Sequence, residues 1–112
     1  MAIIAVLFGC TGEKNAFLRP FWRLVPSHGC VDMPETLKQD LDFSSLDLAT
    51  GAYFRYEGSL TSPPCTEGVK WLVMERLQGA SIEQADRIKA AMPMPNARPT
   101  RPLNGRAVAI FR

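Results

Sequence analysis

The sequence predicts a mixed, β-dominated α+β fold, and three observations carry this prediction. Residues 2–8 form an apolar run rich in aliphatic and β-branched side chains, which is the pattern of a strand covered on both faces. Residues 53–58 and 69–77 predict two more strands, because they combine aromatic and β-branched residues between turn-forming residues. Residues 81–84, Ser-Ile-Glu-Gln, form a capping box that opens one well-defined helix. Strands therefore outnumber helices.

The helix after the capping box shows the spacing of an amphipathic helix. Its apolar residues are expected to share one face: Ile82, Ala85, Ile88 and Met92. Pro93 and Pro95 are expected to end this helix. An extended segment over 96–106 and a last short strand over 107–111 complete the predicted order.

The remaining segments are predicted to be less regular. A short helix is expected from Asn15, as its N-cap, to Val25, although Pro20 removes one backbone donor inside it. Residues 9–12 predict a turn, and residues 26–50, with their prolines, glycine and aspartates, predict a long irregular surface segment.

Composition limits the class of protein. The chain has 112 residues, enough for one domain at most, of which 46% are hydrophobic and 21% charged, as in ordinary globular proteins. A net charge of +2 without a run of like charges gives no sign of a nucleic-acid or membrane partner. The apolar run over 2–8 is also too short to span a bilayer.

The three cysteines leave at least one thiol without an intrachain partner. They are Cys10, Cys30 and Cys65. Residues 7–10, Leu-Phe-Gly-Cys, bear a weak likeness to the cleavage box of a bacterial lipoprotein signal, which would make the chain a small surface lipoprotein. No Lys or Arg precedes the apolar run, so a strand is the favoured interpretation.

Residues 58–65, Gly-Ser-Leu-Thr-Ser-Pro-Pro-Cys, place hydroxyl groups on a turn between two predicted strands. Proline restricts the backbone and removes donors, so the hydroxyls and amides of Thr61 and Ser62 can be held in fixed positions. Taken alone, this pattern favours an ordinary Ser/Thr/Pro turn.

The wider string YFRYEGSLTSPPCTEGVKW, residues 53–71, resembles the active-site signature of α-class carbonic anhydrases at nearly all its positions. Other segments resemble elements of the same family in the same order: MAIIAVLF, NAFLRPFWRLVP, DLDFSSLDL, SIEQ and NARPTRPLNGR. The resemblance covers almost all of residues 1–112 and implies the C-terminal portion of a large, mostly antiparallel, twisted sheet with peripheral helices. It identifies the chain as a partial domain of this family.

The resemblance implies zinc-dependent, reversible hydration of carbon dioxide to bicarbonate and a proton, the carbonate dehydratase (lyase) reaction, with the zinc chemistry carried over from the family. By that resemblance, Thr61 is the catalytic residue. Its hydroxyl would accept a hydrogen bond from the zinc-bound hydroxide and donate its own hydrogen to an upstream glutamate, while its amide would help to bind substrate. Ser62 would line the bicarbonate side. Four residues would form the apolar wall for carbon dioxide: Ile3, Leu60, Val69 and Trp71.

The same resemblance places the three zinc-ligating histidines, the glutamate and the proton-shuttle histidine before the strand that Met1 opens. We therefore expect this chain alone to hold no zinc. Its one histidine, His28, matches no family ligand and is expected to lie exposed in a loop. A different metal site formed by His28 with the three cysteines is disfavoured, because the spacing offers no compact ligand pairs.

The resemblance also bears on the thiols. In bacterial members of the family, the cysteine at the position of Cys65 bridges to one near the N-terminal end of the domain, so Cys65 is expected to be unpaired here. Whether Cys10 and Cys30 bond to each other is left open by the sequence.

Two functional hypotheses follow. The first is an inactive portion of a carbonic anhydrase, whose partner would be the missing N-terminal portion of the same domain. The second is a non-catalytic binding or scaffold module derived from the fold. Complete bacterial members of the family are periplasmic or secreted. We expect poor folding of the chain alone, because uncovered strand edges beside apolar residues promote aggregation.

Overall fold

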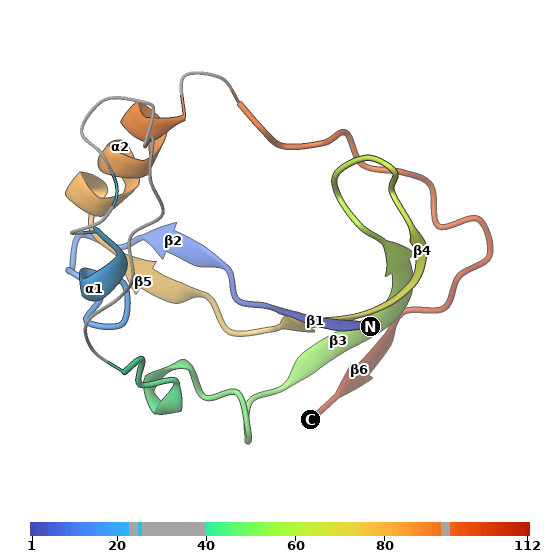
Figure 1. The fold of residues 1–112 in the computed structure, drawn as a ribbon. Coiled ribbons are helices and arrows are strands. Elements are labelled where there is room, and N and C mark those ends of the chain that lie inside the picture. The colour runs from blue at the N-terminus through green and yellow to red at the C-terminus, as the bar shows by residue number, and fades with distance from the viewer. Residues whose placement is uncertain (23–24, 26–39, 93–94) are drawn as a thin grey trace. The chain divides into compact units, whose positions relative to one another are not determined.

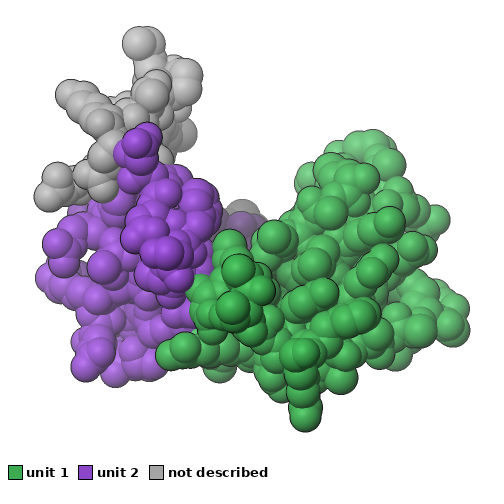
Figure 2. Space-filling model, turned by 90° about the horizontal axis from the view of Figure 1, so that it is seen from below, with its two compact units in different colours: residues 1–7, 47–77, 97–112 green, residues 8–46, 78–96 purple. Residues whose placement is uncertain are grey.

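The computed structural model describes residues 1–22, 25, 40–92 and 95–112. The chain divides into two compact units, which Figure 2 shows in different colours. Unit 1 comprises Met1–Leu7, Asp47–Leu77 and Ala97–Arg112, and unit 2 comprises Phe8–Leu46 and Gln78–Asn96. Each unit is therefore assembled from segments that lie far apart in the sequence.

Unit 1 contains a four-stranded sheet in the order β1-β4-β3-β6 (Figure 1). The strands are β1 (Ala2–Ala5), β3 (Tyr53–Ser59), β4 (Glu67–Met74) and β6 (Ala109–Phe111). β3 runs antiparallel to β4 and β6, whereas β1 runs parallel to β4. The mixed, strand-rich fold that the sequence predicts is confirmed.

The expectation that the first strand is covered on both faces is wrong for the described residues. β1 ends at Ala5 and forms an edge of the sheet, with β4 on one side only. Its residues alternate between exposed and half-buried, and the side chain of Ile4 is 53% exposed. An apolar run predicts a strand well but does not state how many neighbours the strand will have.

The register of β3 and β4 decides which residues share a face. Tyr56 pairs with Trp71 and Gly58 pairs with Val69, while Ile3 of β1 pairs with Trp71 from the other side. Paired residues in adjacent strands point to the same side of a sheet, so these five residues share one face. The pairing shifts between Gly58 and Ser59, where β3 leads into residues 60–66, the loop of the signature, here called the signature loop.

Unit 2 contains the parallel pair of β2 (Phe8–Cys10) and β5 (Gln78–Ala80), together with the short helix α1 (Arg19–Trp22), the longer helix α2 (Ile82–Ala91) and the 3-10 turn η1 (Ser44–Leu46). β2 extends into the range predicted to be a turn. The strand predicted over 69–77 ends early, because β4 ends at Met74, and β5 begins at Gln78, after the predicted range. Of the predicted irregular segment, 26–39 lies outside the described residues.

α1 is shorter than the helix predicted from Asn15. The amide of Phe17 donates to Oδ1 of Asn15 at 3.0 Å, so the side chain of Asn15 closes a local turn, and regular helix begins only at Arg19. This is a common competing use of an asparagine side chain. Residues 23 and 24 lie outside the described part of the chain.

α2 begins as predicted, with the complete capping box of Ser81 and Gln84. Its predicted apolar face is not buried, however: Ile82 is 61% exposed, and Ile88 and Met92 are also exposed. The buried residue of this helix is the polar Gln84. The helix ends at Ala91, and Pro93 lies outside the described residues.

Gln84 is buried because its amide joins two distant segments of unit 2. Its Oε1 accepts hydrogen bonds from the amides of Asn15 at 2.9 Å and Ser81 at 3.1 Å, and its Nε2 donates to the carbonyl of Asn15 at 3.1 Å. The backbone carbonyl of Gln84 accepts from Nε1 of Trp22 at 2.6 Å. A buried polar side chain with hydrogen bonds at both its oxygen and its nitrogen replaces the apolar contact that the spacing predicts.

Large apolar side chains are seldom fully enclosed in the described residues. The buried apolar residues are Leu18, Leu46, Val69, Met74 and Ala80. Val69 is almost completely buried, with 1% exposed, and is the only large side chain of the described residues to be so. The described residues contain no helix with the length and apolar character needed to cross a membrane.

Candidate active-site wall

The signature loop between β3 and β4 is closed by its own backbone. The amide of Leu60 donates to the carbonyl of Thr66 at 2.9 Å, and the amide of Cys65 donates to the carbonyl of Ser62 at 2.9 Å. The peptide bond between Pro63 and Pro64 is cis. These bonds hold the segment that carries Thr61 as a defined turn, as the proline-rich sequence predicts.

The loop is also attached to β4 through Trp71. Nε1 of Trp71 donates to the carbonyl of Ser59 at 3.0 Å, and the indole stacks on the ring of Tyr56 with centroids 6.4 Å apart and planes at 8°. A Cβ atom at Gly58 would lie 3.0 Å from Trp71 and 3.1 Å from Tyr56. Glycine at position 58 therefore allows both rings to lie against the backbone of β3.

A cavity of about 620 Å³ lies on this face of unit 1. Three of the predicted site residues line it, namely Leu60, Thr61 and Trp71. Phe54 and Val73 extend its apolar lining along the strands. The cavity is thus apolar along the sheet and carries a hydroxyl group at the loop.

Thr61 is exposed, and its hydroxyl makes no hydrogen bond to any residue that the structure describes. Leu60, next to it, is half-buried, and its carbonyl accepts from the hydroxyl of Ser59 at 2.9 Å. The hydroxyl of Thr61 is therefore available to a molecule in the cavity as both donor and acceptor.

The other predicted site residues do not line this cavity. Ser62 is exposed on the loop and uses its carbonyl to close the turn. Ile3 is half-buried and adjoins Trp71 in the register of β1 and β4, and Val69 is buried on the same face. The structure thus brings Leu60, Thr61 and Trp71 into one cavity and sets Ile3 and Val69 beside it.

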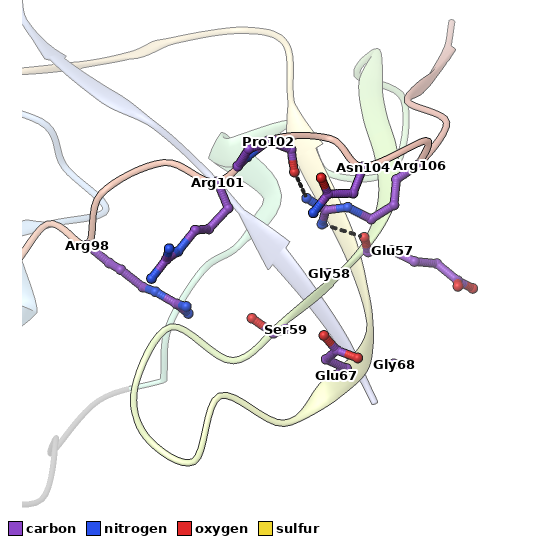
Figure 3. Close-up of a pocket in the computed structure, with 10 residues that line it drawn as sticks. All are labelled: Glu57, Gly58, Ser59, Glu67, Gly68, Arg98, Arg101, Pro102, Asn104 and Arg106. Carbon is purple, nitrogen blue, oxygen red and sulfur yellow. Dashed lines mark hydrogen bonds between the residues drawn. The ribbon is translucent and has the colours of Figure 1, made fainter.

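Sequence reasoning missed the arginines of the segment after α2. Arg98, Arg101 and Arg106 line this cavity and also an adjacent polar cavity of about 560 Å³ (Figure 3). Arg98 and Arg101 each precede a proline, which predicts extended backbone but not a shared wall, and Arg106 carries no such signal.

The donor set of the described residues decides whether they can hold a zinc ion. Nowhere among them do three His, Cys, Asp or Glu side chains come close enough to bind a metal ion. Cys10 is exposed, Cys65 is half-buried, and neither is in a disulfide within the described residues. His28 and Cys30 lie outside them. This part of the chain does not fit a catalytic zinc, which requires three protein ligands.

Comparison with known proteins gives one consistent family. The family model described as eukaryotic-type carbonic anhydrase matches residues 1–111. The chain is 37% identical over 108 residues to a carbonic anhydrase of Pectobacterium atrosepticum, covering 96% of this chain and 43% of the relative. It is 39% identical over 107 residues to one of Neisseria gonorrhoeae, covering 95% of this chain and 40% of the relative.

Solved structures agree with the sequence relatives. The α-carbonic anhydrase of Thermovibrio ammonificans, solved with the inhibitor sulfanilamide, gives a TM-score of 0.83 at 36% identity, covering 96% of this chain and 46% of that one. A dioscorin solved with ascorbate gives a TM-score of 0.80 at 33% identity, covering 98% of this chain and 47% of that one. The chain spans less than half the length of each of these proteins. It is a member of the α-type carbonic anhydrase family, matched over part of the family's domain.

Proposed function

We propose that this chain supplies the carbon dioxide side of a carbonic anhydrase site, and that the zinc ligands belong to the part of the domain that it does not match. Residues 1–112 are then a partial domain, the C-terminal portion. The complete domain hydrates carbon dioxide reversibly to bicarbonate, and the chain alone is inactive.

One observation carries the proposal: Leu60, Thr61 and Trp71 line a single cavity in a chain whose family match runs over residues 1–111. Carbon dioxide is small and apolar, so the indole of Trp71 and the side chain of Leu60 provide a surface on which it can rest. Val69 and Ile3, on the same sheet face, extend the apolar wall in the proposal.

Thr61 takes the catalytic role and Ser62 the bicarbonate side. The hydroxyl of Thr61 is exposed in the cavity and unused by the described residues, so it can accept one hydrogen bond and donate another. The loop bonds of Leu60 and Cys65 hold the backbone that carries this hydroxyl before any ligand arrives, which is the preorganisation that catalysis favours. Zinc, which the described residues do not fit, would be held by the completing portion.

A complementation assay tests the proposal. The part of the Pectobacterium atrosepticum carbonic anhydrase outside the 108 matched residues, here called the complementary portion, is produced separately and also fused to this chain. Carbon dioxide hydration is followed by stopped flow with added zinc. We expect background rates from each piece alone and chelator-sensitive hydration from the mixture or the fusion.

Two outcomes contradict the proposal. Chelator-sensitive turnover by the purified chain alone would mean that it holds its own metal. A folded fusion that binds zinc without hydrating carbon dioxide would instead indicate the alternative, a non-catalytic scaffold module.

The Thr100→Val variant, at an exposed threonine that also lines the cavity, is the matched control for Thr61→Val in the fusion.

A further inference from the structure

Two arginines on the wall of the cavity have guanidinium groups that form no ion pair within the described residues. Arg98 and Arg101 are exposed, and neither forms an ion pair with a carboxylate of the described residues. Arg98 makes one long hydrogen bond, from NH1 to the carbonyl of Leu60 at 3.4 Å, and no hydrogen bond within the described part is made by Arg101. Figure 3 shows the two side chains projecting toward the same region beside Ser59.

Arg106 provides a contrast on the same segment. Its Nε donates to the carbonyl of Leu103 at 2.8 Å, its NH1 to that of Glu57 at 3.0 Å and its NH2 to that of Pro102 at 2.9 Å. The guanidinium of Arg106 therefore holds the segment against β3. Arg106 attaches this segment to β3, whereas Arg98 and Arg101 keep most of their donors without a partner among the described residues.

The carboxylates nearby do not neutralise this pair. Glu57 lines the polar cavity, but Figure 3 shows its carboxylate pointing away from the arginines. Glu67 lines the same cavity from β4 and forms no ion pair with Arg98 or Arg101. Two guanidiniums on one wall fit an incoming carboxylate, which can accept paired hydrogen bonds from an arginine.

The surface around the arginines is apolar and open. Leu103 is 56% exposed and Val108 is 48% exposed, and both line the same cavity as Trp71. Beside this face, the edge of β1 away from β4 pairs with no strand of the described residues and carries no charged residue. A bare, uncharged edge is a template for adding a further strand.

These features fit a polypeptide better than a small ion. The chain covers 43% of the Pectobacterium relative and 46% of the Thermovibrio structure, so a complete domain contains more residues than this chain supplies. In the part of the chain that the structure describes, an apolar face, an unpaired strand edge and two arginines without ion pairs together match a segment with apolar side chains and a carboxylate.

We propose that this face of unit 1 docks the portion that completes the domain, and that Arg98 and Arg101 recognise an aspartate or glutamate on it. The identity of the partner rests on the proposed function. The role of the two arginines does not depend on catalysis, because it concerns binding alone.

The test measures the affinity of the fluorescently labelled complementary portion for the full chain by anisotropy, without zinc. We expect Arg98→Gln with Arg101→Gln to weaken binding by about tenfold or more, since charge-assisted hydrogen bonds are lost. The double variant Arg98→Lys with Arg101→Lys should recover part of the affinity, because the charge returns without the planar fork.

The matched control is Arg76→Gln with Arg112→Gln. Both residues are exposed arginines of unit 1 that do not line either cavity, so this variant changes net charge equally. Its affinity should equal that of the unchanged chain. Far-UV circular dichroism of each variant establishes that secondary structure is retained.

Several results would overturn the inference. The first is that the complementary portion does not bind. The second is that the Arg98→Gln, Arg101→Gln variant binds with the affinity of the unchanged chain. The third is that the control variant loses as much affinity as this double variant. Displacement of the complementary portion by millimolar hexanoate would indicate a small-anion site, and arginine-dependent self-association in sedimentation would indicate a second copy.

Failure of this inference is distinguishable from failure of the proposed function. Arginine-dependent binding without hydration by the fusion leaves the docking surface intact and removes the enzymatic role. If the fusion hydrates carbon dioxide but the separate complementary portion binds equally well to the Arg98→Gln, Arg101→Gln variant, the enzymatic role stands and the role of the two arginines is removed.

Discussion

The indole nitrogen of Trp71 donates to the backbone carbonyl of Ser59 across 3.0 Å. This bond connects the middle of β4 to the residue at which the register of β3 shifts and the signature loop begins. The loop that carries Thr61 is therefore anchored by a side chain ten positions further along the chain. Trp71 thus both lines the cavity and anchors the loop that carries Thr61.

Replacement of Trp71 by phenylalanine should loosen the signature loop. The ring stays apolar, but the bond to Ser59 is lost, so the amide of Leu60 should exchange its hydrogen about two- to tenfold faster. Hydrogen exchange followed by NMR checks this. Trp22→Phe in unit 2 is the control, and it should leave Leu60 unchanged; equal exchange in both variants would show that Trp71 does not hold the loop.

Thr61→Val should lower carbon dioxide hydration by the completed domain. We expect a loss of roughly 100-fold in kcat/KM, the size found when one preorganised hydrogen-bonding group is removed. Thr61→Ser, which keeps the hydroxyl, should retain most of the rate. Stopped-flow assay of the fusion measures this, and an unchanged rate for Thr61→Val would remove Thr61 from the site.

Val69→Ala should destabilise the domain more than a change at an exposed valine. Val69 is almost completely buried, so the lost contacts and the new void should cost about 1–3 kcal/mol. Val108→Ala, at a site 48% exposed, makes the same chemical change with a much smaller expected effect. Denaturant unfolding of the fusion compares the two, and equal midpoints would contradict the packing described for β4.

Gln84→Leu should disrupt unit 2 locally. The substitution keeps the apolar part of the side chain but leaves the amides of Asn15 and Ser81 without their acceptor. Each unsatisfied group should lower the free energy of unfolding by about 1–3 kcal/mol. Both amides should lose protection in hydrogen exchange. Glu83→Gln, at an exposed neighbour on the same helix, is the control, and protection that survives Gln84→Leu would disprove the network.

Asp42 should titrate below the usual range of an aspartate. The hydroxyl of Ser44 and then its amide donate to the carboxylate, and both bonds lower the pKa of Asp42. A lowered pKa in the folded chain favours folding above the pKa of the unfolded aspartate, and this contribution disappears as the pH falls through the folded value. NMR titration should show the pKa rising in Ser44→Ala and staying low in the Ser45→Ala control.

The signature over 53–71 determined the family by itself, since the family match and the solved structures agree with it. Local chemistry also determined the strand over Tyr53–Ser59 and the start of α2, because aromatic residues and a capping box act through neighbours in the sequence. The roles of the site residues stay predictions until the assays above are made.

Tertiary structure decided what local patterns cannot state. β1 lies at an edge because only β4 pairs with it in the described residues, and the apolar residues of α2 stay exposed because Gln84 makes its contacts with Asn15. Likewise, the extended segment over 98–106 lines the cavity because Arg106 donates to the carbonyl of Glu57, 49 positions away. Such long-range pairing depends on where the chain returns, which composition and periodicity do not encode.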